Sequence, residues 1–534
     1  MATPKDKNEE EILERIASLY GQLDDIRDQR KEVSNIDRQD GPRVVLVTRR
    51  LPRDERRRGQ RVPDTMDQAL SNFRQVTASG RDVYWVGSPV THVQTAGEQR
   101  ALRDQLLRDM KYAPVFLDAK RERLFYDGFC KRVLWPLFHS SPPTTEDTVM
   151  RAPRHTNEAE EDRDDDDTMW AAYVGANQAF ADAVRDVTVE GDLIWIQDYH
   201  FMLLPRMLRQ LEPNAKLGFF LHVPFPSSEL YRTLPFREEI LKGLLAADLL
   251  GFQTYDYARH FLSSCEMVLG LETAPDHVEH EGHLTKVCVC PVGIEPEVVK
   301  ARSLASPTLA AIRRLEGQLQ GRALFLGVDT LDPTKGLVHK LLAFEDLFSQ
   351  HPELADELVF VQVVLGAGGA ANLKPEVHDG RLARTISGKS AKPTGRLELD
   401  VAPKGSKGVF STLERQLHAM VSRINSQYAT LDFEGPVQYF GADAKTPPGE
   451  ATLAALFALA DVLVITPIRD GMNVVPFEYL VAREAHKKLG AVLLSEFAGC
   501  ARSLGGAVLV NPWDTRRVTT LLYRLFRRAR RANM

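Results

Sequence analysis

Short apolar runs alternate with stretches of helical spacing along most of the chain. The apolar runs predict a first series of strands at 43–48, 83–87, 114–117, 192–197, 217–221, 248–253 and 287–292. A second series is predicted at 322–328, 358–365, 437–440, 460–466, 491–495 and 507–510. Helical spacing separates most of these runs, as at 255–269 and 337–349. Because strands that alternate with helices form parallel sheets, the pattern predicts an α/β protein with two doubly wound, Rossmann-like domains that face each other across a cleft.

The restart of the strand pattern near residue 320 indicates where the domains divide. A length of 534 residues also favours two large domains over one. We expect an N-terminal helical extension at 1–40, an N-terminal Rossmann-like domain at 41–295 and a C-terminal Rossmann-like domain at 296–534. In the extension, apolar residues spaced by three and four predict an amphipathic helix over 8–33. This helix either lies on its own domain, which is the favoured interpretation, or pairs with a partner helix.

Three further segments depart from the alternation. Residues 140–168 hold Pro142-Pro143 and an acidic run with few apolar residues, so we expect a disordered surface insertion rather than a binding site. Residues 366–408 are rich in Gly, Lys and Pro, and we expect a mobile loop there. Residues 125–139 are aromatic and predict a helix that Pro136 stops.

Composition narrows the class of protein. A hydrophobic content of 43% and a charged content of 26% are typical of a soluble globular chain. The net charge of −5 gives no global basic field for nucleic acid. Five cysteines without a Cys-x-x-Cys pair favour a reducing compartment over a disulfide scaffold. The charged N-terminus and the absence of an apolar run of about 18 residues predict no secretory signal and no membrane contact. We therefore expect a cytoplasmic location.

The loop at 467–478 is the strongest candidate for a site. It follows the apolar run at 460–466 and precedes a stretch of helical spacing, so it lies at the carboxyl end of a predicted strand, where open α/β sheets bind ligands. Gly471 lets backbone N–H groups approach an anion, and the following helix offers its N-terminus to a phosphate. Asp470 and Glu478 are acceptors for sugar hydroxyls. Asp-Gly alone would predict only a turn, but the whole pattern favours a nucleotide-sugar site.

Other motifs occur in order along most of residues 43–514. They are Trp135 to His139, Asp198 to His200, Gly218 to Glu229, Tyr231 to Pro235, Gly251 to Arg259, Lys335-Gly336, Arg469 to Asn473, Ser495 to Gly499 and Asn511 to Trp513. Each motif alone is weak evidence for a family. Together the motifs resemble those of the trehalose-6-phosphate synthases, which are glycosyltransferases of the GT-B fold. This family transfers glucose from UDP-glucose to glucose-6-phosphate with retention of configuration, and it needs no metal or other cofactor.

The resemblance implies a donor site in the C-terminal domain. Lys335 would neutralise the diphosphate, amides after Asn473 would bind it, and Glu478 would accept from the ribose hydroxyls. Asp470 and His222 would hold the donor glucose. The implied catalytic residues are His222, Asp470 and Lys335, and the implied donor-binding set is Lys335, Asp470, Gly471, Met472, Asn473, Val474, Val475 and Glu478.

The resemblance also implies an acceptor site in the N-terminal domain. Tyr126, Trp135 and Asp198 would line it, Trp85 would contribute, and Arg50 would bind the acceptor's phosphate. The implied partners are the two small-molecule substrates, together with a homo-oligomer or a partner synthase subunit.

Several positions depart from the family pattern. Thr330 stands where active members usually carry an arginine, five residues before Lys335, and 53–61 shows no Gly-Gly-Leu loop. Ser88 replaces a tryptophan, an asparagine expected near Lys131 is absent, and 403–409 offers lysines in place of an acceptor-phosphate arginine. Such losses resemble a plant-type class of the family with regulatory roles.

Three hypotheses follow from the motifs and their departures. The favoured one is an active synthase that makes trehalose-6-phosphate. The second is a catalytically weak homologue that binds sugar phosphates or a partner synthase. The third, a glycogen-synthase-like enzyme with another acceptor, is disfavoured because Tyr126, Trp135 and Asp198 match the trehalose family.

Overall fold

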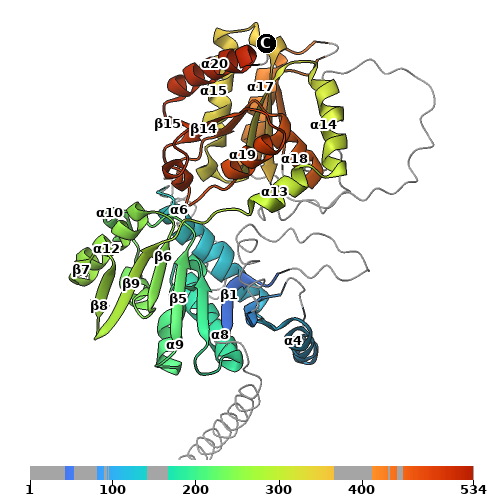
Figure 1. Ribbon diagram of the computed structural model, residues 1–534. Helices are drawn as coiled ribbons and strands as arrows, with labels where there is room; N and C mark the ends of the chain where they lie inside the picture. Colours follow the sequence, from blue (N-terminus) through green and yellow to red (C-terminus); the bar gives the residue numbers. More distant parts are fainter. Residues whose placement is uncertain are drawn as a thin grey trace, which may run out of the picture.

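The computed structural model describes residues 43–52, 81–89, 93, 95–140, 166–365, 412–430, 433–441 and 449–532. These residues form two lobes, each built on its own sheet (Figure 1). The predicted helix at 8–33 lies outside the described residues, as do nearly all of the insertion at 140–168 and the loop at 366–408. The limits proposed for the two domains remain predictions.

The N-terminal lobe contains a nine-stranded sheet in the order β3-β2-β1-β4-β5-β6-β9-β8-β7. Its strands are β1 (Val44–Arg50), β2 (Val83–Ser88), β3 (Tyr112–Pro114), β4 (Leu193–Gln197), β5 (Lys216–Leu221), β6 (Leu249–Phe252), β7 (Thr273–Ala274), β8 (His277–His280) and β9 (His283–Val289). Neighbours from β3 to β9 pair in parallel, whereas β8 pairs antiparallel with β7 and β9. The parallel strands were predicted, although β3 begins two residues earlier than expected. The β7–β8 hairpin was missed.

Helices cover this sheet mainly on one face. They are α4 (Ala96–Met110), α5 (Ala119–Glu122), η1 (Arg123–Leu134), α6 (Trp135–Phe138), α8 (Asp166–Val187), η3 (Tyr199–Phe201), α9 (Leu204–Leu211), α10 (Ser228–Tyr231), α11 (Arg237–Leu244) and α12 (Tyr255–Leu269). Side chains of η1, α8, α9, α11 and α12 share one apolar core with the strands. The opposite face carries a smaller cluster that includes Trp85.

Two predictions about these helices were wrong in detail. Pro136 does not stop the aromatic helix, because η1 is a π-helix that continues directly into α6, and Pro136 lies in the first turn of α6. The proposed insertion also extended too far, because Asp166, Asp167 and Thr168 already belong to α8. Acidic residues suit the first turn of a helix, whose N-terminus is positive.

The C-terminal lobe contains a six-stranded parallel sheet in the order β12-β11-β10-β13-β14-β15. Its strands are β10 (Ala323–Thr330), β11 (Leu358–Leu365), β12 (Val437–Phe440), β13 (Val462–Ile465), β14 (Ala491–Ser495) and β15 (Val508–Val510). The helices are α13 (Pro296–Ser303), α14 (Ser306–Leu319), η4 (Pro333–Lys335), α15 (Leu337–Gln350), α16 (Leu354–Glu357), α17 (Thr412–Ser426), α18 (Glu450–Leu459), α19 (Val475–Ala485), η6 (Gly499–Arg502) and α20 (Thr515–Ala532).

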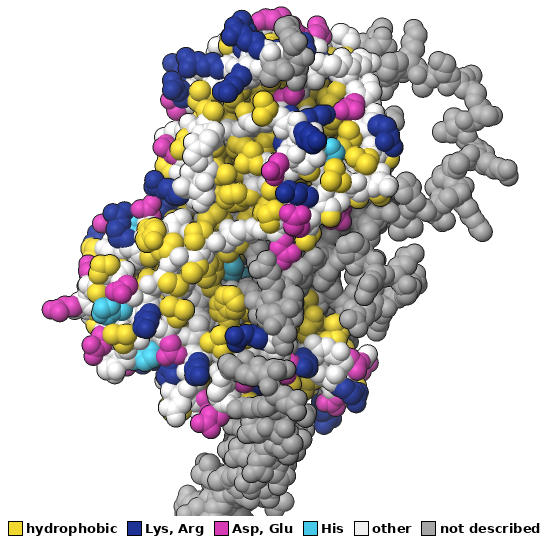
Figure 2. Space-filling model, viewed as in Figure 1, with side chains coloured by type: hydrophobic (Ala, Val, Ile, Leu, Met, Phe, Trp, Pro, Cys, Tyr) yellow, Lys and Arg dark blue, Asp and Glu magenta, His cyan; other side chains and the backbone are white. Residues whose placement is uncertain are grey.

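This second sheet is covered on both faces, as a doubly wound fold requires. One core contains side chains of α14, α18 and α19, and the other contains side chains of α15, α17 and α20. The basic end of the chain is part of helix α20, which buries Val518, Leu522, Leu525 and Phe526 and presents its arginines to solvent (Figure 2). Within the described residues, no helix combines the length and the apolar composition that a membrane span needs.

Candidate active site

The donor loop, residues 466–474, connects the end of β13 to the start of α19. Asp470 is its central side chain and is only 7% exposed. The Lys335 ammonium donates to Asp470 Oδ2 at 2.8 Å, and the Asn473 side-chain amide donates to the same oxygen at 3.1 Å. The structure therefore brings together three residues that the sequence placed in the donor site.

Backbone packing places Lys335 beside this loop. Lys335 ends the short helix η4, and Gly336 follows in the left-handed conformation with φ 66°. A Cβ at Gly336 would lie 2.0 Å from the Thr466 carbonyl oxygen, so the turn needs glycine both for its dihedral angle and for its close packing. The Ile468 amide also donates to the Thr334 carbonyl at 2.7 Å. These contacts fix the Lys335 turn to the donor loop.

The Lys335–Asp470 pair is charged in spite of its burial. Burial alone would lower the pKa of Lys335, but the Asp470 carboxylate outweighs this effect and holds that pKa above its usual value. Burial would likewise raise the pKa of Asp470, and the Lys335 ammonium reverses the shift so that this pKa is low. An anion that binds Lys335 must therefore compete with Asp470.

Gly471 brings the donor loop against the N-terminal lobe. A Cβ at Gly471 would lie 2.2 Å from the carbonyl oxygen of His222, at the end of β5, so a larger residue would push the lobes apart. The Tyr257 hydroxyl of α12 also donates to the Asp470 carbonyl at 2.9 Å. His222 therefore lies at the junction of the two lobes, and its role in holding the donor glucose stays a prediction.

Asp198 and His222 are linked within the N-terminal lobe. Asp198 Oδ1 accepts from the His222 amide at 3.1 Å, and His222 Nε2 lies 3.0 Å from Gln197 Oε1. Asp198 adopts φ 73°, an uncommon value for a non-glycine residue and one that is concentrated at functional sites. Burial raises the pKa of Asp198, against the opposing effects of His222 and two backbone hydrogen bonds. This carboxyl group is thus held in a fixed position and in an apolar environment.

The two aromatic residues predicted for the acceptor site lie on two helices that follow each other directly. Tyr126 belongs to η1, its ring stacks on His200 with centroids 5.8 Å apart, and the Arg49 guanidinium lies 3.8 Å from the same ring centroid. Trp135 begins α6, and the Lys131 ammonium lies 3.6 Å from its ring centroid. Two cations therefore lie over the two rings that the sequence assigned to the acceptor.

Trp85 does not fit its predicted role. It is 3% exposed and packs with Val44 and Leu46 in the apolar cluster of the sheet, so its ring is a core residue and the predicted acceptor contact is wrong. The Arg50 guanidinium forms an ion pair with Glu122 and donates to the Pro89 carbonyl at 3.1 Å. A phosphate at Arg50 would have to compete with these contacts, and the role of Arg50 stays a prediction.

Glu478 lies in the first turn of α19, and its role as an acceptor for ribose hydroxyls stays a prediction. Arg302 of α13 contacts it at 3.4 Å and contacts Glu450 at 3.3 Å. Burial raises the pKa of Glu478, and Arg302 opposes this shift. Arg302 could not be found from the sequence, because α13 lies far from the donor loop along the chain.

Three further residues predicted for the donor site lie in the same loop. Asn473 Oδ1 accepts from the Val475 amide at 3.1 Å, so that amide is already engaged. The Met472 side chain packs against the core of the C-terminal lobe. Val474, which precedes α19, remains a predicted backbone donor to the diphosphate.

His139 was part of a quoted motif but had no assigned role. Its ring lies 4.0 Å from the Trp135 ring, and Nδ1 is 2.9 Å from the Trp135 carbonyl oxygen. Burial, more than the Lys335 charge, lowers the pKa of His139 to about 4, so the imidazole is neutral near pH 7. The charges of Lys335 and Asp470 also act on this pKa, so His139 lies near both Trp135 and the ion pair.

The neutral His139 predicts a pH-dependent stability. Between pH 6.5 and about 4 the unfolded chain binds a proton at this residue and the folded chain does not, so stability falls as pH falls through that range. His139→Gln should make the unfolding free energy less dependent on pH by about 2 kcal/mol between pH 7 and pH 5. Denaturant titrations at both pH values measure this slope. The exposed His277→Gln should keep the wild-type slope, and an unchanged slope in His139→Gln would contradict the prediction.

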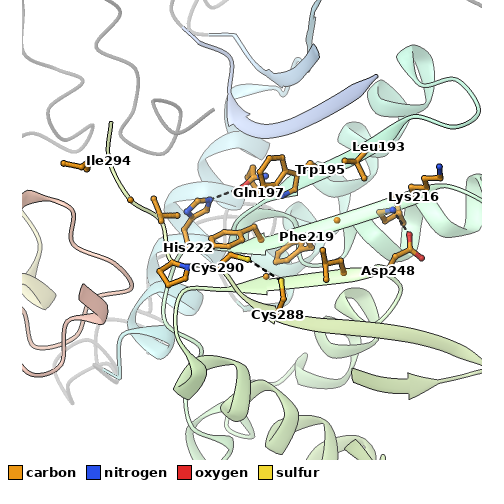
Figure 3. A pocket seen from close by; sticks show the side chains of 18 of the residues that line it. Leu193, Trp195, Gln197, Lys216, Phe219, His222, Asp248, Cys288, Cys290 and Ile294 are labelled. Atoms are coloured by element: carbon orange, nitrogen blue, oxygen red, sulfur yellow. Dashed lines mark hydrogen bonds between the residues drawn. The ribbon is translucent and has the colours of Figure 1, made fainter. Parts of the chain in front are cut away.

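A pocket of about 790 Å³ lies on the less covered face of the N-terminal sheet (Figure 3). Trp195, Phe220 and Leu249 are among its mostly apolar lining residues. Of the predicted site residues, only His222 lines it, at the end of the pocket nearest the donor loop. The candidate site is therefore the junction of the lobes and not this pocket.

Across the residues that the structure describes, no group of three or more His, Cys, Asp or Glu side chains is arranged to hold a metal ion.

A sequence profile of glycosyltransferase family 20 matches residues 42–393 and 399–529. The chain belongs to glycosyltransferase family 20.

Solved structures agree with this family assignment. The N-terminal domain of a trehalose-6-phosphate phosphatase from Candida albicans is 27% identical, with a TM-score of 0.70 over 92% of this chain and 90% of that one. An α,α-trehalose-phosphate synthase (UDP-forming) from Burkholderia vietnamiensis is 25% identical, with a TM-score of 0.69 over 91% and 90%. The predicted GT-B fold is confirmed.

Curated relatives of this family 20 protein include α,α-trehalose-phosphate synthase [UDP-forming] 1 of Arabidopsis thaliana. It is 37% identical over 492 residues, which is 91% of this chain and 46% of the relative. The chain thus spans about half the length of the first curated relatives that it matches.

Proposed function

We propose that this protein transfers glucose from UDP-glucose to glucose-6-phosphate and releases trehalose-6-phosphate and UDP. The observation that carries the proposal is the meeting of the two half-sites at one junction. The Lys335–Asp470 pair of the C-terminal lobe lies beside the His222–Asp198 pair of the N-terminal lobe, and Gly471 contacts His222 directly. The names of the Arabidopsis and Burkholderia relatives support the same reaction.

The donor half of the reaction depends on charge. In this proposal the diphosphate displaces Asp470 from Lys335, and the freed carboxylate accepts from hydroxyl groups of the donor glucose. Negative charge grows on UDP as the glycosidic bond breaks, so a cation fixed beforehand at that position stabilises the transition state more than the ground state. Glu478, held by Arg302, accepts from the ribose hydroxyls.

The acceptor half depends on position. Tyr126 and Trp135 offer ring faces, and Asp198 offers a carboxyl group at the end of β4. No protein side chain is assigned as a nucleophile, and the departing diphosphate takes the proton of the acceptor hydroxyl, which suits a transfer with retention of configuration. No metal or other cofactor enters the proposed reaction. Water must be excluded for transfer to compete with hydrolysis, and the close contact of the lobes at Gly471 supports this.

A direct assay tests the proposal. UDP release from UDP-glucose should require glucose-6-phosphate and should yield trehalose-6-phosphate in equal amount. Lys335→Met and Asp470→Asn serve as negative controls within the same fold. If UDP release is absent with glucose-6-phosphate but the protein binds UDP, the transfer reaction is wrong and nucleotide binding stands.

A second candidate is a catalytically weak homologue that binds sugar phosphates or a partner synthase. Thr330 favours it, since this half-buried residue ends β10 at a position where a cation would face the diphosphate, five residues before Lys335. The solved N-terminal domain of a protein named as a phosphatase also shows that this fold occurs outside proteins named as synthases. The assay above separates the two candidates by the rate of UDP release.

Thr330→Arg should raise turnover more than donor affinity. Lys335 supports binding of the diphosphate in the ground state, whereas an added cation acts most where charge grows on the leaving group. We expect kcat to rise roughly tenfold and the Kd for UDP to change less, in line with a charge-assisted contact. Steady-state kinetics on both proteins measure the difference. Thr520→Arg on the exposed side of α20 is the matched control, and a fast wild type with an unchanged variant would refute the weak-catalyst candidate.

A further inference from the structure

Two cysteines lie side by side at the end of β9. Cys288 and Cys290 are separated by one residue of an extended segment, so both side chains point to the same face of the sheet, whereas Val289 packs against the core on the other face. Their Sγ atoms are 3.8 Å apart, with one thiol donating to the other (Figure 3). Both cysteines line the pocket on the less covered face of this sheet. The pattern Cys-x-Cys thus forms a pair of neighbouring thiols.

These two thiols are the accessible ones among the five cysteines of the chain. Cys290 is exposed and Cys288 is half-buried, whereas Cys130, Cys265 and Cys500 are buried. Burial, and then the neighbouring thiol, raises the pKa of Cys288 to about 11, so this group stays protonated near pH 7. A reagent in solution therefore reaches Cys290 first, and Cys288 is the thiol beside it.

The pair is not built for zinc. A structural zinc ion takes four ligands, usually cysteines and histidines. Within the described residues, no third His, Cys, Asp or Glu is grouped with these two thiols. The chemistry that two neighbouring thiols support by themselves is oxidation to a disulfide.

The pair directly precedes the connection between the two lobes. Residues 291–295 follow Cys290 and lead to α13, the first helix of the C-terminal lobe. The Cys290 amide donates to the Phe252 carbonyl at 2.9 Å, and the Val292 amide donates to Gln253 Oε1 at 2.9 Å. These two hydrogen bonds hold the start of the connection against the end of β6.

The end of β6 is in turn linked to the donor loop. Thr254 comes directly after this strand and its short exit, and its side chain caps α12. In the first turn of α12, the Tyr257 hydroxyl donates to the Asp470 carbonyl. A shift of the segment after Cys290 therefore reaches the donor loop through two hydrogen-bonded steps.

A disulfide at this position would change the backbone. In an extended strand the Cα atoms of alternate residues lie about 6.5 Å apart, near the upper limit for a disulfide, whose usual separation is about 5.5–6 Å. Closure therefore shortens the segment between Cys288 and Cys290 and strains the hydrogen bond from Cys290 to Phe252. A strained disulfide is easily reduced, so the pair is a dithiol in a reducing compartment and closes only when the concentration of oxidant rises.

We propose that Cys288 and Cys290 are a redox-sensitive pair, which a low-molecular-weight disulfide such as oxidised glutathione converts to an intramolecular disulfide, and that this closure slows the proposed transfer by moving the connection between the lobes. The Cys290 thiolate attacks the oxidant, releases one small thiol and is left as a mixed disulfide. Cys288 then loses its proton and attacks Cys290 Sγ, which forms the new bond and releases the second small thiol. The two cysteines are thereby oxidised, the small disulfide is reduced, and both protons end on the released thiols. The effect on rate rests on the proposed function, whereas the formation of the bond does not.

Peptide mass spectrometry on the native protein tests the bond. After treatment with oxidised glutathione, the peptide that holds both cysteines should lose its two thiol hydrogens, and dithiothreitol should restore them. Hydrogen exchange at the Cys290 and Val292 amides should be faster in the oxidised protein. UDP release should be roughly tenfold slower and should recover with dithiothreitol, since a small displacement between reacting groups is sufficient for such a loss.

Two variants serve as matched controls. Cys290→Ser should keep the wild-type rate and should not respond to oxidised glutathione, because the exposed thiol is absent. Cys265→Ala removes a buried thiol of α12 and should respond as the wild type does. Thermal unfolding of each variant confirms that it is folded.

Other outcomes overturn the proposal in distinct ways. If the treatment leaves both cysteines reduced, or leaves glutathione on Cys290 without a bond to Cys288, the two thiols are not a redox-sensitive pair. If the bond forms but hydrogen exchange and UDP release do not change, closure does not move the connection between the lobes. If the reduced wild type releases no UDP, the proposed function fails and the effect on rate with it, and the mass and exchange measurements then decide alone whether the pair closes and moves the backbone.

Discussion

Replacing Lys335 with alanine should weaken UDP binding roughly ten- to a hundredfold, because a charge-assisted contact to a phosphate contributes about 1.5–3 kcal/mol. Turnover should fall further, since the same ammonium stabilises the leaving group. The variant also leaves Asp470 buried without its cation, and an unpaired buried carboxylate destabilises the fold. Isothermal calorimetry with UDP, together with the unfolding midpoint, separates the two effects.

Asp470→Asn is the matched partner of this variant. It removes the anion that competes for Lys335, so UDP should bind as tightly as in the wild type or more tightly, while turnover falls because the donor glucose loses its acceptor. Opposite changes in UDP affinity for the two single variants would support competition between Asp470 and the diphosphate. Unchanged UDP affinity in a folded Lys335→Ala variant would show that Lys335 does not bind UDP.

Gly471→Ala should lower kcat by about a hundredfold or more. The added Cβ would lie 2.2 Å from the His222 carbonyl oxygen, so the donor loop and β5 would have to separate. A displacement of about 1 Å between reacting groups is sufficient for a loss of this size. UDP binding should change less, because Lys335 and Glu478 belong to the same lobe as the loop. Initial rates and UDP titrations on one protein preparation measure both quantities.

Gly505→Ala is the control for this substitution, because a Cβ at that position would meet no atom within 4 Å. It should retain wild-type rates and stability. A Gly471→Ala protein with wild-type kcat would mean that the reacting state does not keep the contact between Gly471 and His222.

Most of the fold followed from local patterns. Strands such as β10 and β11 are continuous apolar runs because both faces of the C-terminal sheet are buried, and such runs are recognisable without tertiary information. The short antiparallel hairpin β7–β8 was missed because its polar, two- and four-residue strands carry no comparable pattern. The continuation of η1 through Pro136 was missed because a π-helix changes which backbone groups are bonded.

Trp85 shows where motif matching fails. It stands in a stretch that the family pattern marks, but the direction of a side chain on a strand alternates between the two faces of the sheet at every residue. The Trp85 side chain faces the apolar cluster of the N-terminal sheet. Its place in the motif did not reveal this direction.

The doubly wound architecture, the donor loop at the end of β13 and the family were all predictable from the sequence, because they depend on local periodicity and on motifs of contiguous residues. The Lys335–Asp470 ion pair, the contact between Gly471 and His222 and the position of Arg49 over the Tyr126 ring became visible only in the folded protein. These contacts join residues from different strands, helices and lobes. Their distances depend on how the two sheets pack, and no local pattern encodes that packing.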